Sequence, residues 1–130
     1  MMLMFSRITF VIGVVFIVFS CAGNSSEQEV ARLFESASKA ELANKFDEAI
    51  NTYERIIANY PDYPNLDKAY FMIGFIKSET LKQKQEALTY FQTVLDKYPQ
   101  SELVDDAEFM VKTIEMDTDA LTAFQQATGQ

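Results

Sequence analysis

Two stretches, 46-FDEAINTYERIIANYP-61 and 84-KQEALTYFQTVLDKYP-99, decide how this chain folds. They belong to a longer internal repeat, in which residues 46–77 align with residues 84–115 at an offset of 38. Nine of the aligned positions are identical, and six more exchange one apolar or aromatic residue for a similar one. Because self-similarity at a fixed period is typical of repeat architectures, we interpret the two stretches as copies of one structural unit.

Within each unit the apolar residues recur at the spacing of one helix face. Pro61 and Pro99 cannot continue the helices that precede them, and Asn44 suits a helix end. Asp67 and Ser101 are candidate N-caps for the helices that follow. Strand signals are absent. The pattern predicts an all-α chain with helices at about residues 27–43, 46–59, 66–79, 84–97 and 102–115, and a sixth helix over 118–127.

The first twenty residues differ from the rest and predict an export signal. Residues 8–19 are almost entirely apolar, follow the basic Arg7 and precede the small residues around Cys21. A helix of that length spans about 18 Å, which is shorter than the roughly 30 Å of a bilayer core. We therefore predict a signal peptide over residues 1–20, a lipidated cysteine with a tether over residues 21–28, and one domain over residues 29–130.

The residues Val18-Phe19-Ser20-Cys21 resemble the lipobox of bacterial lipoproteins, although Phe19 replaces the usual small residue. The resemblance implies that Cys21 becomes the first residue of the mature chain and carries a diacylglyceryl thioether and an amide-linked acyl chain. Two or more acyl chains are what stable anchoring requires. Ala22, which is not the aspartate of inner-membrane retention, implies the outer membrane, with the domain facing the periplasm.

The repeat resembles the tetratricopeptide repeat and predicts a short solenoid of five to six antiparallel helices. The resemblance lies in Ala37…Ala49-x₃-Tyr53-x₂-Ile56-x₄-Pro61 and in Gly74…Ala87-x₃-Phe91-x₂-Val94-x₄-Pro99. Three additional residues follow each proline, and one more lies between Gly74 and Ala87. The longer turn is similar to that of the lipoproteins that assist outer-membrane β-barrel assembly. It is also similar to that of the periplasmic partner of the Tol–Pal system.

The third copy of the first helix departs from this pattern. Lys112 stands where the first two copies have the small residues Ala37 and Gly74. Because a lysine leaves no room for a closely packed partner helix, we expect the third repeat to be incomplete. Helix 102–115 would then cap the solenoid, with its outer face toward water or a partner.

Composition excludes several classes of function. The chain has no histidine, so it lacks the commonest general base and metal ligand, and no glycine-rich phosphate loop is present. Removing residues 1–20 takes away one basic residue and no acidic one, which changes the net charge from −8 to −9. Such a charge disfavours nucleic acid and adhesion to anionic lipid. We predict no enzyme, no metal site, no cofactor, no nucleic-acid partner and no small-molecule substrate.

The resemblance places the first helix of each repeat on the concave side of the solenoid. It implies a partner-binding surface formed by Phe34, Lys68, Phe71, Phe75, Ser78, Glu79 and Phe109. Phe34, Phe71 and Phe109 occupy equivalent positions and would form an apolar strip. Either the segment 118–127 seals this strip, or a peptide or helix of another protein binds to it.

The first hypothesis for function is an outer-membrane lipoprotein adaptor that holds a protein segment in this groove, in outer-membrane protein assembly or envelope maintenance. The second is an inner-membrane protein whose uncleaved anchor carries a repeat domain that assists a secretion or chaperone complex. A third, a periplasmic enzyme, lacks any nucleophile constellation in the sequence.

Overall fold

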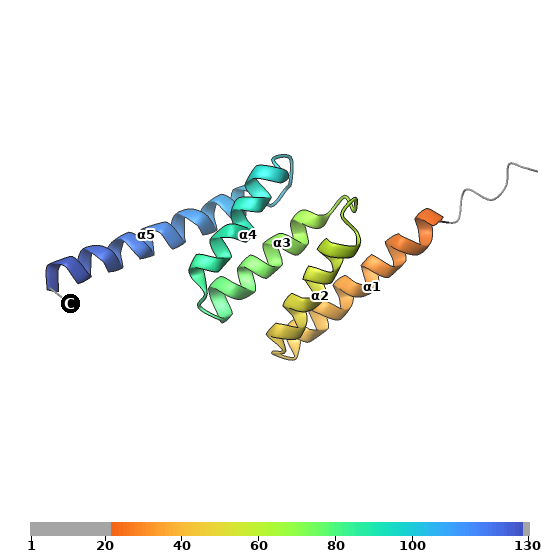
Figure 1. Ribbon diagram of the computed structural model, residues 1–130, viewed down its shortest axis with the longest axis horizontal. Coiled ribbons are helices and arrows are strands. Elements are labelled where there is room, and N and C mark those ends of the chain that lie inside the picture. The colour runs from red at the N-terminus through yellow and green to blue at the C-terminus, as the bar shows by residue number, and fades with distance from the viewer. Residues whose placement is uncertain (1–21, 129–130) are drawn as a thin grey trace, which may run out of the picture.

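The computed structural model describes residues 22–128, which form helices joined by short turns and contain no β-strand (Figure 1). The helices are α1 (Ala22–Leu42), α2 (Phe46–Asn59), α3 (Leu66–Phe75), which continues into the π-helical turn η1 (Ile76–Thr80), α4 (Lys84–Lys97) and α5 (Val104–Thr128). Each α-helix packs mainly on its neighbours in the chain. The described helices therefore form an antiparallel row with α1 at one end and α5 at the other, and the predicted all-α helical-repeat fold is confirmed.

Equivalent residues of the two repeats adopt the same backbone conformation. Tyr60 ends α2 with φ −130° and ψ 56°, and Tyr98 ends α4 with φ −128° and ψ 54°. Asn44, after α1, and Lys82, after η1, each have φ 58°. This left-handed conformation reverses the chain between the paired helices, and asparagine adopts it more readily than lysine. The two copies of the repeat therefore share the same backbone structure, including the conformation of their turns.

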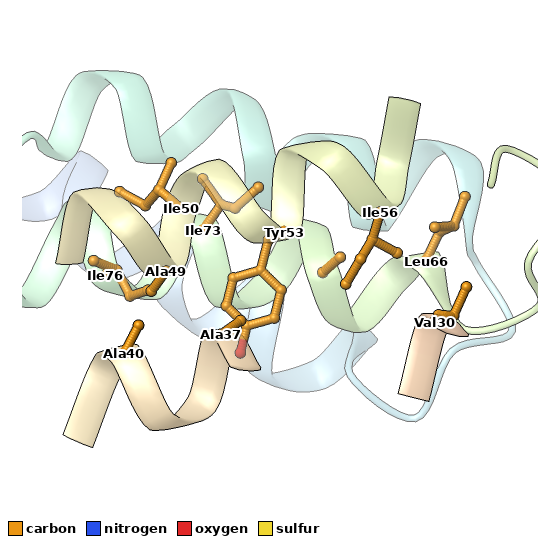
Figure 2. Packing of buried hydrophobic residues seen from close by; sticks show 11 residues of the cluster. Val30, Ala37, Ala40, Ala49, Ile50, Tyr53, Ile56, Leu66, Ile73 and Ile76 are labelled. Carbon is orange, nitrogen blue, oxygen red and sulfur yellow. The ribbon is translucent and has the colours of Figure 1, made fainter. Parts of the chain in front are cut away.

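The core consists of two clusters of buried side chains. Figure 2 shows the first, in which Tyr53 of α2 points toward α1 beside Ala37. Its buried members are Val30, Ala37, Ala40, Ala49, Ile50, Tyr53, Ile56, Leu66, Ala69, Ile73 and Ile76. The second has Ala87, Phe91, Val94, Ala107 and Ile114. Tyr70 packs against both clusters and so links the two halves of the solenoid.

Helices α3 and α4 approach closely where Phe91 of α4 meets Gly74 of α3. A Cβ atom added at Gly74 would lie 3.0 Å from Cε1 of Phe91, closer than real Cβ atoms ordinarily come. Phe91 is completely buried. The hydrogen atom in place of a side chain at Gly74 is therefore what allows the aromatic ring of α4 to lie flat against α3.

In the first repeat, the position equivalent to Phe91 is occupied by Tyr53, which forms a hydrogen bond with Glu41. The hydroxyl of Tyr53 donates a hydrogen bond of 2.7 Å to Oε1 of Glu41 on α1. Burial first, and then this carboxylate, raise the pKa of Tyr53. In the second repeat Phe91 replaces the tyrosine and Ser78 stands in place of the glutamate. The second repeat thus lacks both the tyrosine donor and the glutamate acceptor. Because the two are lost together, neither is left buried without its hydrogen-bond partner.

The additional residue between Gly74 and Ala87 is accommodated by η1. In this turn the amide of Leu81 donates to the carbonyl of Ile76, five residues earlier, at 3.1 Å. A π-helical turn holds one more residue than an α-helical turn. The predicted α-helix over residues 66–79 therefore ends at Phe75 and continues as a π turn.

Two expectations about the helix that follows the second repeat are corrected. The separate sixth helix over residues 118–127 does not exist, because α5 runs without a break from Val104 to Thr128. The segment between Glu115 and Thr118 contains no proline or glycine that would end a helix. All described residues from Glu115 onward are exposed, so they do not seal the phenylalanine strip.

Two corrections concern helix starts. α1 begins at Ala22, so residues 22–28 of the predicted tether are helical, which is the favourable extension of a helix already fixed by buried Val30. Asp67 lies inside the first turn of α3 and does not cap it. Ser101 accepts a hydrogen bond of 3.0 Å from the amide of Leu103 and so satisfies a donor just before α5. The predicted signal peptide and Cys21 lie outside the described residues.

No helix within residues 22–128 combines the length and the apolar character needed to cross a bilayer.

Replacing Phe91 by alanine should lower the free energy of unfolding by about 3–5 kcal/mol, because it leaves a cavity between α3 and α4. Phe109 supplies a matched control, since it is the same residue type but 68% exposed. Phe109→Ala should change stability by no more than about 0.5 kcal/mol. Chemical denaturation of both variants measures the difference, and equal losses would contradict the assigned packing.

Candidate protein-binding surface

The predicted surface residues on α1 and α3 gather into two aromatic contacts. Phe34 is half-buried, with its ring 5.8 Å from that of Tyr53 and 6.1 Å from that of Tyr63. The ammonium group of Lys68 lies 5.8 Å from the centre of the Phe34 ring and so connects α3 to α1 through a cation–π contact. Phe34 and Lys68, both members of the predicted surface, thus lie together.

The second contact extends from the core to the surface of α3. Phe71 is half-buried and packs edge-on against buried Phe91, with ring centres 5.4 Å apart. Phe75 stacks on Phe71 at 6.4 Å and is 41% exposed. The aromatic pair is therefore rigid at its inner end and accessible at its outer end, which suits an anchor for a bound chain.

The remaining predicted residues do not join this surface. Phe109 lies on α5 and is exposed, so the three phenylalanines do not form a sealed strip. Ser78 is only 1% exposed, because the π turn directs it inward, and it cannot contact a partner in this conformation. Its neighbour Glu79 is exposed, with Oε1 3.2 Å from the Ser78 hydroxyl.

A cleft of about 850 Å³ lies beside Lys68 and Phe71 and includes residues that the sequence pattern assigned to packing. One wall is the start of α3, and the other is the turn between α4 and α5. The lining residues are Pro64, Asn65, Asp67, Lys68, Phe71, Met72 and residues 97–103. The sequence feature that could have indicated this cleft is the turn after each proline, which is three residues longer than in the tetratricopeptide repeat. The turn after Pro99 forms the second wall.

Polar groups of the cleft are fixed by contacts between the repeats. Ser101 donates a hydrogen bond to Oδ2 of Asp67, which ties the second wall to the first. Oδ1 of Asp67 is buried and has no hydrogen-bond partner. This oxygen is enclosed by the protein, so the Asp67 carboxylate joins the two walls and is not an acceptor open to a bound chain.

Tyr98 is the aromatic residue of the second wall. Its ring lies 5.9 Å from that of Tyr70, which belongs to both core clusters. Burial is the main cause that raises the pKa of Tyr98, with smaller contributions from Tyr70 and Asp67. The hydroxyl is therefore protonated at neutral pH and available as a donor.

The chemical character of the cleft comes from a few charged and aromatic groups. Within residues 22–128 no group of cysteine, aspartate or glutamate side chains is placed to hold a metal ion. The cleft combines two lysines, two carboxylates and the half-buried aromatic rings of Phe71 and Tyr98. Such a mixture of apolar surface and a few polar groups is typical of surfaces that bind a polypeptide segment.

The sequence model of the family YfiO, described as outer membrane lipoprotein, matches residues 34–121. This range contains both repeats, the cleft and most of α5. No curated protein and no solved structure matches the chain significantly.

Phe75→Ser should change the free energy of unfolding by less than about 1 kcal/mol, because its ring is already partly in water. Phe71→Ser should lower it by about 2 kcal/mol, since it removes the edge contact with Phe91. Thermal and chemical unfolding of the two variants distinguish a surface ring from a core ring. Equal losses of stability in the two variants would contradict the assignment of Phe71 to the core and Phe75 to the surface.

Proposed function

Since the chain belongs to the YfiO family of outer membrane lipoproteins, we propose that it is an adaptor, anchored through Cys21, that binds a segment of another envelope protein in the cleft between α3 and the Tyr98 turn. The domain faces the periplasm and acts in outer-membrane protein assembly or envelope maintenance. It performs no catalysis and needs no cofactor.

The observation that carries this proposal is the composition of the cleft wall. Phe71 and Tyr98 supply aromatic surface in the cleft, and the core contact with Phe91 holds Phe71 in place. Lys68 and Lys97 supply positive charges of the lining. A segment with apolar side chains and an acidic or polar group has the complementary groups.

Anchoring through Cys21 follows from the charge and from the position of α1. A domain with a net charge of −9 has no electrostatic attraction to anionic lipid, so the acyl chains would supply the membrane affinity. α1 begins at the residue after Cys21. The lipid would thus join the solenoid without a flexible linker and hold its first helix close to the bilayer.

The alternative is an inner-membrane protein with an uncleaved anchor that assists a secretion or chaperone complex. Mass spectrometry of the chain from separated membranes distinguishes the two. A lipidated Cys21 at the start of the chain in the outer membrane supports the adaptor proposal. An intact Met1 in the inner membrane supports the alternative.

Binding in the cleft predicts a position-dependent crosslink in living cells. A photoreactive residue in place of Met72, inside the cleft, should crosslink to a discrete envelope protein. The same residue in place of exposed Arg55 on α2 should not. Adding Lys68→Glu and Lys97→Glu, which reverse the two positive charges of the lining, should remove most of the crosslink from position 72. If positions 55 and 72 give the same products, the cleft is not the binding surface.

Cys21→Ser should release the chain from the membrane fraction, because the acyl chains supply its membrane affinity. Fractionation after a salt wash measures the loss, with Ser26→Cys on the Cys21→Ser background as a control for a thiol without a lipobox. A Cys21→Ser chain that stays with the outer membrane would contradict the anchoring proposal.

A further inference from the structure

The last helix exposes the surface that the preceding repeat covers. The repeat before it covers half-buried Phe71 and buried Gly74 of α3 and Ser78 of η1, which is 1% exposed. At the offset of 38 these positions become Phe109, Lys112 and Met116 of α5. Phe109 is 68% exposed and Met116 is 71% exposed. Within the described residues, α5 thus lacks the helix that would correspond to α4.

This bare surface continues along the helix as an apolar stripe, defined here as Phe109, Met116, Ala120, Phe124 and Ala127. The spacings of seven, four, four and three residues place all five on one face of a helix. The stripe is about 27 Å long at 1.5 Å per residue. Phe124 is 64% exposed, so both ends carry an accessible aromatic ring.

The far end of the stripe also lies beyond the body of the solenoid. Lys84, the first residue of α4, pairs with Asp117 of α5, and every later described residue of α5 is exposed. Figure 1 shows this end of α5 extending past its neighbours. A short helix without tertiary contacts is only marginally stable in water, so a partner helix along the stripe would stabilise it.

Charge indicates the kind of partner. α5 carries six carboxylates, Asp105, Asp106, Glu108, Glu115, Asp117 and Asp119, and one lysine. That lysine, Lys112, lies 3.5 Å from Glu108. Two copies of α5 facing each other would bring these carboxylates together, which disfavours self-association through the stripe. A helix with basic residues beside its apolar face is complementary.

We propose that the stripe is a second docking site, which binds a basic amphipathic helix of another protein in the position that α4 occupies on α3. Because Lys112 stands where α3 has Gly74, the bound helix carries a small residue where α4 has Phe91. The cleft of α3 plays no part in this contact, so the two sites are separable.

The probe is a helix-stapled peptide with the α4 sequence from Lys84 to Lys97, changed by Phe91→Ala, Glu86→Lys and Asp96→Lys. Its matched control keeps Glu86 and Asp96, carries Phe91→Ala and replaces the two terminal lysines by glutamate. Binding is measured by fluorescence anisotropy to the full lipidated chain in phosphatidylcholine nanodiscs, with empty nanodiscs subtracted. The cationic peptide should bind with a Kd at least about tenfold lower, and this advantage should shrink as salt is added.

Four variants of the chain locate the binding. The double variant Phe109→Ser, Met116→Ser should raise the Kd by about tenfold or more. Leu42→Ser, at an 83% exposed position on α1, and Phe75→Ser, at an exposed position on α3, should leave it unchanged. Lys112→Gly should favour a cationic peptide that retains Phe91, because it recreates the space beside Gly74.

Four outcomes would overturn the proposal. The first three are equal binding of the two peptides, binding retained in the double variant, and loss of binding in Phe75→Ser, which would place the peptide on the aromatic surface of α3. A dimer in analytical ultracentrifugation that Met116→Ser disrupts would assign the stripe to a second copy of the chain and also overturn it.

Discussion

The contact between Phe91 and Gly74 holds the second repeat together, and the binding surfaces depend on it. The ring of Phe91 lies against α3 only because Gly74 has no side chain. The same ring supports Phe71 edge-on, and Phe71 in turn supports Phe75 at the surface. One close approach in the core therefore fixes the ring of Phe71 in the wall of the cleft. On α5, where Lys112 replaces the glycine, no such close approach occurs within residues 22–128, and the equivalent face of the helix is exposed.

Much of the solenoid follows from local sequence features. The bounds of α2 and α4 agree with the prediction because an apolar face and a following proline define each of them. The left-handed Asn44 ends α1 close to the predicted residue. These are interactions between residues near one another in the chain, so a sequence pattern contains them.

What the pattern missed depends on how distant segments meet. The π turn arises because one additional residue must fit without shifting Ile76 out of the core, and it turns Ser78 inward. The cleft forms because Ser101 binds Asp67, 34 residues away. The prediction divided α5 into two helices, but its backbone continues without a break past Asp117, where it meets the first residue of α4. The sequence predicted one surface that included Phe34, Lys68, Phe71 and Phe75, but it indicated neither the separate contacts of these residues nor the second wall of the cleft.

The most direct test of this dependence is to place in α3 the residue that α5 carries at the same position. Gly74→Lys should lower the free energy of unfolding by at least about 3 kcal/mol, because it overpacks the contact with Phe91 and buries a charge. Ser38→Lys, at an exposed position of α1, is the matched control and should leave stability nearly unchanged. Chemical denaturation of the full chain measures both. A Gly74→Lys chain that unfolds with the stability of the Ser38→Lys control would contradict the account.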